Sequence, residues 1–228
     1  DTDGGRLTVI TTSGRLVRTL QLGKLVYLSG FALDGHGGYL VGSEDPDGYV
    51  LFHLDSTGKQ IGRFLKIRDV LPRGMPDSPY WRNVRNFYLS ALHDTAYVTL
   101  TYSDTLWRVS LRDSTETATV ITPPGYEVPA PPKTELKTLD DLKTWSHSLQ
   151  LTVTPTAGEA GVVVNFVKGI LNYGDPNTAV VRLPNADWVA IPRAPAFLLA
   201  DGRSLVTLAS AGDSASADVV LGLYQPLK

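Results

Sequence analysis

The chain has 228 residues, a formal net charge of −2 and charged side chains at 19% of its positions, which excludes an intrinsically disordered chain. It shows no basic stripe of the kind that nucleic-acid-binding proteins carry, and no apolar run near the roughly 18 residues that a membrane-spanning helix needs. Cysteine is absent, which excludes disulfides and thiolate metal sites. We therefore expect no nucleic-acid partner and no transmembrane segment.

The compartment is predicted from composition. Thr, Ser, Asp and Gly are frequent, Lys is sparse, and the chain begins at Asp1 rather than Met, as after loss of a signal peptide or of an N-terminal segment. A chain without thiols suits an oxidising compartment, although cytosolic proteins can also lack cysteine. We expect an extracytoplasmic protein, periplasmic or secreted.

Short alternating apolar segments separated by Gly, Asp and Pro predict many short strands. One strand–turn–strand pattern recurs. It is clearest at Val50–Leu54, where a turn at Asp55–Lys59 leads into a second strand at Gln60–Leu65. Equivalent positions in the first strand of each copy are 43, 57, 72 and 40 residues apart, at Val9, Phe52, Val109, Val181 and Leu221.

Inner hairpins lie between these outer ones and complete a unit of four antiparallel strands. Phe87 to Leu92, for example, turns at His93–Asp94 into Ala96 to Tyr102. A propeller blade takes about 40–50 residues, so the shorter intervals fit without insertions and the longer ones carry extra loops. We predict an all-β chain, a β-propeller of four-stranded antiparallel blades with about four to five blade equivalents visible. The alternative is a β-sandwich.

The predicted propeller is a single domain over residues 1–228. It begins with an outer hairpin at 6–22, continues with three blades at 27–65, 86–121 and 147–191, and ends with a partial blade at 196–224. Two loop insertions, at 66–85 and 122–146, lie between the blades. We expect the N-terminal hairpin and the strand at Val219–Leu223 to lie in one shared blade or at two open edges, because unpaired sheet edges invite aggregation.

Alternation within the outer strands predicts which side chains are buried. Phe52, Trp107 and Val181 are expected between blades, while His53 and Arg108 fall on the opposite, solvated face of their strands. His36 and His93 occupy equivalent turns, each beside an aspartate. They could serve in metal binding or acid–base chemistry, but Asp, Gly and His also suit tight turns, and we interpret them as structural.

The outer-strand pattern from Val50 to Lys59 resembles that of the NHL-like and lactonase-like six-bladed β-propellers, and the resemblance extends over roughly Arg6 to Tyr224. It implies a six-bladed ring, of which this chain would be a short or partial form. In the lactonase-like proteins, Glu, Asn and Asp at inner-strand ends hold an axial divalent cation. The matching position offers Asn86, followed by His147 at the start of an inner strand, and one Asn does not make an oxygen-rich cation site.

No metal and no cofactor is therefore predicted. The acidic segment Glu44–Gly48 lacks the alternating spacing of a calcium loop and is interpreted as a solvated turn. No Gly-x-Ser-x-Gly elbow and no phosphate-binding loop occurs in the sequence. With no visible catalytic constellation, we predict a non-enzymatic binding or scaffolding module.

Irregular length collects on one face of the predicted propeller. Both insertions are links between blades, and 169–178 is the longest loop on the same side. The second insertion contains a predicted short helix with Thr138 as N-cap. Repeat proteins commonly bind through the face that carries their insertions, and Trp, Tyr and Arg are enriched in interface hot spots. We predict that partner contacts are drawn from Tyr80, Trp81, Arg82, Arg85, Tyr126, Trp145 and Tyr173.

The predicted partner is another protein or a larger complex, to which the chain would belong as an accessory subunit. Two alternatives stay open. One is a lactonase- or esterase-like propeller hydrolase with an axial divalent metal. The other is a sugar-binding propeller that uses Trp and Tyr side chains on its loops.

Overall fold

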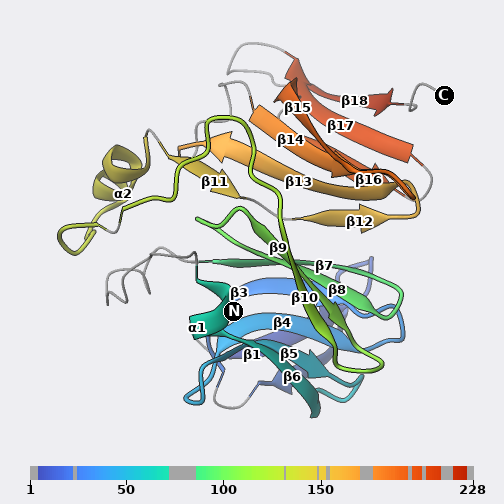
Figure 1. The fold of residues 1–228 in the computed structure, drawn as a ribbon. Coiled ribbons are helices and arrows are strands. Elements are labelled where there is room, and N and C mark those ends of the chain that lie inside the picture. The colour runs from blue at the N-terminus through green and yellow to red at the C-terminus, as the bar shows by residue number, and fades with distance from the viewer. Residues whose placement is uncertain are drawn as a thin grey trace.

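The computed structural model describes residues 5–22, 25–71, 86–130, 132–147, 149–152, 155–169, 177–194, 197–201, 204–211 and 218–224. Of residues 26, 27, 150 and the strands after residue 196, only the backbone is described. This part of the chain is all-β, built from antiparallel and mostly four-stranded sheets with two short helices (Figure 1). The prediction of an all-β chain with four-stranded antiparallel units is confirmed.

Strands β1 (Arg6–Ile10) and β2 (Leu16–Gln21) form the N-terminal hairpin. The first sheet consists of β3 (Val26–Leu33), β4 (Tyr39–Glu44), β5 (Tyr49–Leu54) and β6 (Gln60–Lys66). The second sheet consists of β7 (Phe87–Leu92), β8 (Thr95–Leu100), β9 (Thr105–Ser110) and β10 (Glu116–Val120). The one-turn helix α1 (Ile67–Val70) follows β6.

The third sheet consists of β11 (Gln150–Thr152), β12 (Thr156–Gly158), β13 (Gly161–Lys168), β14 (Asn177–Arg182) and β15 (Trp188–Ala194), and helix α2 (Leu139–Ser146) precedes it. The fourth sheet consists of β16 (Phe197–Asp201), β17 (Ser204–Ala211) and β18 (Asp218–Tyr224). Strands pair in chain order, except that β11 and β12 both pair with β13. The described strands form five separate sheets, and none of these sheets contains a Greek-key crossing.

From the first sheet to the fourth, an edge strand of each sheet lies beside an edge strand of the next. β3 contacts β7, β7 contacts β12, and β12 contacts β16. Figure 1 shows the sheets stacked in chain order, from the first sheet at the bottom to β17 and β18 at the top. The stacking buries both faces of a middle sheet, so its apolar side chains need not alternate with polar ones.

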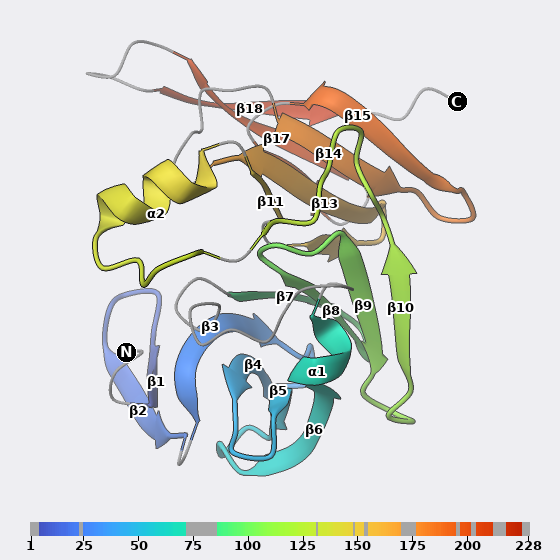
Figure 2. The ribbon, with the colours of Figure 1, turned by 60° about the vertical axis from the view of Figure 1, so that its left-hand side comes forward.

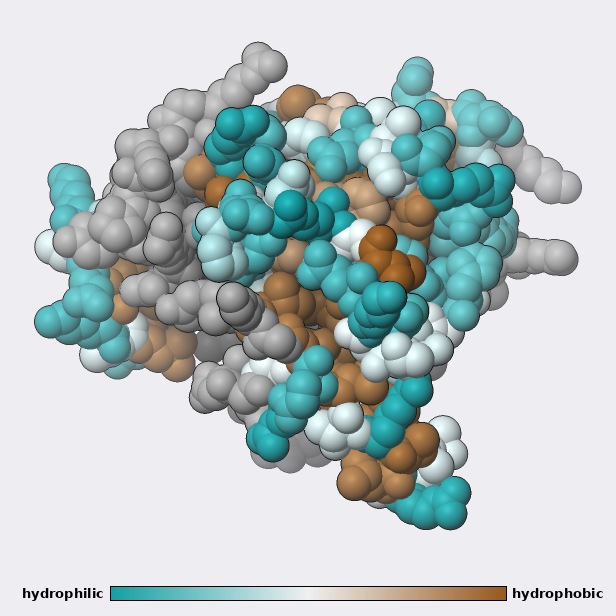
Figure 3. All heavy atoms as spheres, turned by 90° about the horizontal axis from the view of Figure 1, so that it is seen from below, coloured by the Kyte–Doolittle hydropathy of each residue, from teal (hydrophilic) through white to brown (hydrophobic). Residues whose placement is uncertain are grey.

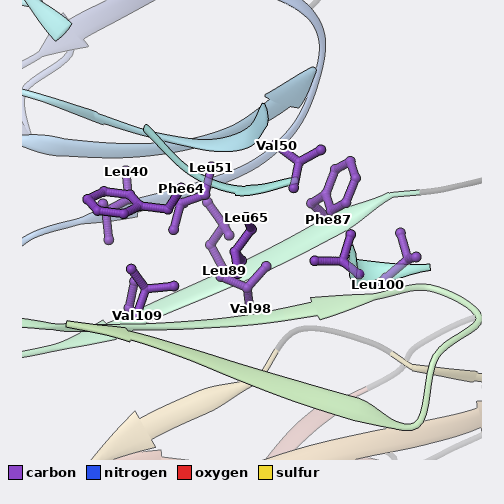
Figure 4. Packing of buried hydrophobic residues seen from close by; sticks show 12 residues of the cluster. Leu40, Val50, Leu51, Phe64, Leu65, Phe87, Leu89, Val98, Leu100 and Val109 are labelled. Atoms are coloured by element: carbon purple, nitrogen blue, oxygen red, sulfur yellow. The ribbon is translucent and has the colours of Figure 1, made fainter. Parts of the chain in front are cut away.

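The interface between the first and second sheets is apolar (Figure 4). Leu51 and Phe64 of the first sheet pack on Leu89, Val98 and Val109 of the second, and each of these side chains is at most 5% exposed. Burying a side chain of this size contributes about 1.5–3 kcal/mol to folding. This interface is therefore a principal source of stability for the two sheets.

Two further interfaces continue the stack. Leu20 of the N-terminal hairpin packs with Val41 and Phe52 of the first sheet. Leu106 of the second sheet packs with Val164 and Val180 of the third. The expected burial of Phe52 and Val181 is confirmed, at 0% and 4% exposed, and Trp107 is half-buried against the first interface.

The expectation that His53 is a surface residue is wrong. Its side chain is 13% exposed, and its Nε2 lies 2.8 Å from Oδ2 of the buried Asp34. β5 lies between the N-terminal hairpin and the second sheet, and the strand therefore has no fully solvated face. Arg108, by contrast, is exposed as expected.

The two ends of the chain belong to separate sheets, because β1 pairs with β2 and β18 pairs with β17. The N-terminal hairpin leaves Ile10, Leu16 and Val17 more than half exposed. Figure 3 views the molecule from below. On the face that it shows, hydrophobic residues form a band through the middle, flanked by hydrophilic ones. Among the described residues, no helix is long and apolar enough to span a bilayer.

Candidate functional site

The residues predicted to contact a partner fall into two groups. Tyr126 and Trp145 are described by the structure. The others lie outside the described residues: Tyr80, Trp81, Arg82, Arg85 and Tyr173. The structure therefore presents this face through the insertion at 122–146.

Tyr126 fastens the start of this insertion to the sheets. Its hydroxyl donates to the backbone carbonyl of Tyr102 at 2.6 Å, and its ring meets the edge of Phe166 with a centroid separation of 6.2 Å. Burial raises the pKa of Tyr126 well above its ordinary value. The residue is thus held in the apolar cluster between the second and third sheets.

Helix α2 begins with the capping box that the sequence predicts. The Thr138 hydroxyl accepts from the Asp141 N–H at 3.1 Å, and the Asp141 carboxylate accepts from the Thr138 N–H at 3.0 Å. These two bonds satisfy backbone donors that no helical carbonyl reaches, and the hydrogen bonds lower the pKa of Asp141. The helix is therefore fixed at its N-terminal end.

Trp145 fixes the other end of α2. Its ring packs edge-on against the ring of Tyr102, with centroids 5.0 Å apart. Leu136 and Leu142 join Trp145 on a buried cluster that includes Leu151. The helix is thus packed on the third sheet through one face, and Figure 2 shows it projecting beside the sheets with the preceding loop running beneath it.

A cavity of about 520 Å³ opens between α2 and the loop before it. Pro132, Leu136 and Trp145 supply apolar lining, and the charged side chains of Lys133 and Asp141 also line it. We call this cavity the α2 groove. Two large apolar side chains of the same insertion, Val128 and Leu139, are 48% and 53% exposed.

The turns on the other side of the sheets are linked by histidine–carboxylate contacts. His36, in the β3–β4 turn, places Nε2 2.9 Å from Asp94 Oδ1 in the β7–β8 turn. His93, beside Asp94, places Nε2 2.7 Å from Glu159 Oε1 in the β12–β13 turn. Hydrogen bonds from His36 and from Arg112 hold the pKa of Asp94 below its ordinary value. Each of these two histidines thus contacts a carboxylate of the neighbouring sheet, which is compatible with their interpretation as structural residues.

The structure places the two positions considered for an axial cation, Asn86 and His147, at different kinds of element. The Asn86 backbone N–H donates to the Thr101 hydroxyl at 2.9 Å, and its side chain is exposed. From the sequence, His147 is expected at the start of an inner strand. In the structure it instead forms the C-cap of α2. Within the described residues, no group of three or more His, Asp or Glu side chains is placed to hold a metal ion.

The acidic segment Glu44–Gly48 forms a turn that is closed by its own contacts. Asp45 accepts from the Tyr49 N–H at 2.9 Å, and Asp47 pairs with Arg63 at 2.6 Å. The guanidinium of Arg63 lies 4.3 Å from the centroid of the Tyr49 ring. These carboxylates are thus used within the first sheet.

One feature of the described structure was not predicted from the sequence. A cleft of about 320 Å³ lies between the second and third sheets, on the side of the histidine-linked turns. Its walls include Tyr97 and Arg108 of the second sheet and Arg182 and Trp188 of the third, and we call it the inter-sheet cleft. The sequence signal was the alternation that places each arginine two residues beyond a buried core residue, but nothing in the sequence shows that the two positions face one another.

The fold resembles that of solved structures. One is the crystal structure of a member of the DUF4221 family from Bacteroides vulgatus, which matches with a TM-score of 0.62 and 8% sequence identity over 98% of this chain and 74% of that chain. At this identity the likeness shows the fold alone. No family model matches the chain, and no curated protein matches it by sequence.

Proposed function

We propose that the protein is a non-enzymatic β-propeller that acts as a binding or scaffolding module. It would be an extracytoplasmic accessory subunit that contacts another protein through the face carrying insertions 66–85 and 122–146. The propeller arrangement is supported by the stacked, mostly four-stranded sheets and by contacts between edge strands of consecutive sheets. Sheets that pack face to face in this way make a rigid platform from which loops can project.

The observation that carries the proposal is the anchoring of the 122–146 insertion. This segment is held in one conformation by Tyr126, by the capping box and by the Trp145–Tyr102 contact. A pre-ordered binding segment pays less conformational entropy on association than a loose one. The anchoring therefore favours a contact surface over a passive connection.

The α2 groove indicates the chemistry of the partner. Its apolar lining, with Leu139 exposed on the same helix, suits an apolar anchor residue of the partner. Among the described residues, no carboxylate lies within salt-bridge distance of the Lys133 ammonium group, although Lys137 and Lys143 each have one. We therefore expect a protein segment that places an acidic residue beside an apolar one.

Site-specific photo-crosslinking tests this proposal. A photoreactive amino acid is placed at Leu139, which is 53% exposed, and in a matched control at Ile61, which is 56% exposed on β6. Cross-linked partners are identified in extracts of the source cell's envelope and cytoplasm. We expect a defined cross-link from position 139 in the envelope fraction, and its loss when Lys133→Glu is added but not when Lys59→Glu is added.

Equal cross-linking from both positions, or cross-linking only from position 61, would count against the insertion-bearing face. The result in each cell fraction reports on the extracytoplasmic location. Stoichiometric divalent metal in the purified protein, together with esterase or lactonase activity, would replace the binding module by the hydrolase alternative.

A further inference from the structure

The inter-sheet cleft lies where the apolar interface between the second and third sheets ends. Leu106 and Val180 are buried in that interface, and two residues further along each strand come Arg108 and Arg182, which are exposed. Because side chains two apart on a strand share a face, both arginines extend from the facing surfaces of the two sheets. Both line the same cavity of about 320 Å³.

Each arginine is paired with an aromatic residue on the neighbouring strand. Arg108 lies opposite Tyr97 in the β8–β9 register, and its guanidinium carbon is 5.9 Å from the centre of that ring. Arg182 lies opposite Trp188 in the β14–β15 register, with a separation of 6.0 Å. The second sheet and the third sheet therefore contribute the same pair of chemical groups to opposite walls of the cleft.

Neither guanidinium has a carboxylate within salt-bridge distance in the part of the chain that the structure describes. Arg63 and Arg112 show the contrast, because each is paired with an aspartate at 2.6 Å. The Nε of Arg182 donates to the backbone carbonyl of Ala186 at 3.2 Å, which orients the guanidinium without neutralising it. Two positive charges thus line one cleft with no carboxylate partner among the described residues.

The remaining wall is compatible with a negatively charged ligand. Glu159 is the carboxylate of the lining, and it lies 2.7 Å from the Nε2 of His93, which also lines the cleft. Two guanidinium groups against one carboxylate leave the lining with net positive charge. Leu92, Val162 and Leu183 supply apolar contact beside the charged groups.

We propose that the inter-sheet cleft binds the carboxylate group of a small organic anion, with Arg108 and Arg182 as the groups that hold it. Guanidinium groups match carboxylates in shape and donate two parallel hydrogen bonds to them. The size of the cleft is at the lower end of the roughly 300–1,000 Å³ that small-molecule sites occupy. The half-buried Trp188 ring flanks the site and provides a flat surface for the remainder of the ligand, while the buried Tyr97 ring lies beneath the Arg108 guanidinium.

Isothermal titration calorimetry at fixed ionic strength tests this site with four probes. Glucuronate presents a carboxylate on a sugar, succinate presents carboxylates without a sugar, glucose is the neutral control, and inorganic phosphate is the anion of different geometry. We expect binding of at least one carboxylate probe, weaker binding of phosphate and none of glucose. Tighter binding of glucuronate would identify an acidic sugar as the source of the carboxylate, and equal or tighter binding of succinate would identify a non-sugar acid.

Variants assign the binding to the cleft. Arg108→Gln and Arg182→Gln each remove one charged donor from an exposed position and are expected to weaken binding about tenfold or more. Arg15→Gln, in the exposed turn of the N-terminal hairpin, should leave the affinity unchanged. A ligand-induced change in tryptophan fluorescence should disappear in Trp188→Phe, although three other tryptophans remain.

Three results would overturn the proposal. One is the absence of carboxylate binding at about 10 mM, which corresponds to no useful affinity. Another is unchanged affinity in both arginine variants while they keep the native circular dichroism spectrum. The third is phosphate binding as tight as carboxylate binding. Because the α2 groove is a separate cavity, none of these results bears on the proposed protein partner.

Discussion

Asp34 joins the β3–β4 turn to strand β5 through a buried carboxylate. Oδ1 accepts from the backbone N–H groups of His36 and Gly38, and Oδ2 lies 2.8 Å from His53 Nε2. Burial raises the pKa of Asp34, but these hydrogen bonds lower it by more, so the folded-state pKa lies below the ordinary value of 3.8. The ionised group therefore contributes stability above about pH 4, and this contribution is lost as the pH falls through the folded-state pKa.

Replacing Asp34 with Asn is expected to lower the free energy of unfolding at pH 7 by about 1–3 kcal/mol, because an amide cannot accept from all three donors as a carboxylate does. The difference between the native protein and the variant should shrink as the pH falls below about 4 and through the folded-state pKa of Asp34. Urea unfolding at a series of pH values measures it, with Asp187→Asn in the exposed β14–β15 turn as control. A difference that stays constant over this range would show that ionisation of Asp34 is not what stabilises the turn.

Trp107 and Arg108 test the assignment of strand faces. Trp107→Ala should cost about 3 kcal/mol, since the half-buried indole packs on the interface between the first and second sheets. Trp107→Phe should cost less than about 1.5 kcal/mol, because the buried Nε1 has no acceptor among the described residues and its removal loses no hydrogen bond. Arg108→Ala should stay within about 0.5 kcal/mol. If chemical denaturation shows a larger loss of unfolding free energy for Arg108→Ala than for Trp107→Ala, the assignment of the two strand faces is wrong.

Alternation within a strand predicted some burial correctly and failed for His53. Phe52 and Val181 are buried as expected, because neighbouring sheets cover the apolar side chains of a strand that lies between them. His53 was placed in solvent because it alternates with Phe52. Its partner Asp34 lies 19 positions earlier, and the pair exists only because β3, β4 and β5 assemble into one sheet. Periodicity carries no information about such a contact.

At the scale of elements, two glycines let β3 and β4 approach β7. A Cβ on Gly30 would overlap the carbonyl oxygen of Phe87, and one on Gly42 would come within 3.1 Å of the Phe87 Cβ. The overlap at Gly30 is with a backbone atom and is severe, whereas the contacts at Gly42 are 3.1 Å or longer and need a shift of only a few tenths of an ångström. Gly30→Ala should therefore destabilise the protein by about 1–3 kcal/mol or more, and Gly42→Ala by less. Thermal unfolding of the two variants measures the difference, and equal loss would contradict the close contact at β3.

The capping box of α2 offers a local test. Thr138→Ala removes the hydroxyl that accepts from the Asp141 N–H and should cost the helix about 1 kcal/mol. Because Trp145 still holds the other end of α2, we expect faster hydrogen exchange in residues 139–146 with little change in the sheets. Thr138→Ser should restore the slow exchange. Faster exchange throughout the chain would show that α2 is part of the global core.

The four-stranded unit was predictable because turn residues recur between apolar segments at blade-like intervals. The third sheet departs from the predicted unit of four strands, because two short strands, β11 and β12, pair separately with β13 at its edge. Pro155 lies between them and has no N–H to donate to the partner strand. The helix α2 was predicted from its cap. The inter-sheet cleft was not predicted, since it depends on which sheets are neighbours.

At the scale of the molecule, stability is expected to depend on how many neighbours a sheet has. The first and second sheets each have an apolar interface on both faces, whereas the N-terminal hairpin packs on the first sheet through one face and exposes Ile10, Leu16 and Val17 on another. In stacked arrays each unit is stabilised mainly by its nearest neighbours. Sequence alone predicted the units, but the number of covered faces follows only from their arrangement.

Hydrogen exchange followed by mass spectrometry tests this dependence. Amides of β4, β5 and β8 should exchange most slowly, because their residues are mostly buried on both faces, and those of β1, β2 and β10 should exchange fastest, because most of their residues are exposed. Leu20→Ala, which removes a contact between the hairpin and the first sheet, should speed exchange in β1 and β2 while leaving β8 unchanged. Leu89→Ala, at the interface of the first and second sheets, should instead speed exchange in β4, β5 and β8 together. Uniform exchange in every strand, or the same pattern for both variants, would mean that the sheets unfold as one unit and that neighbour contacts do not set their individual stability.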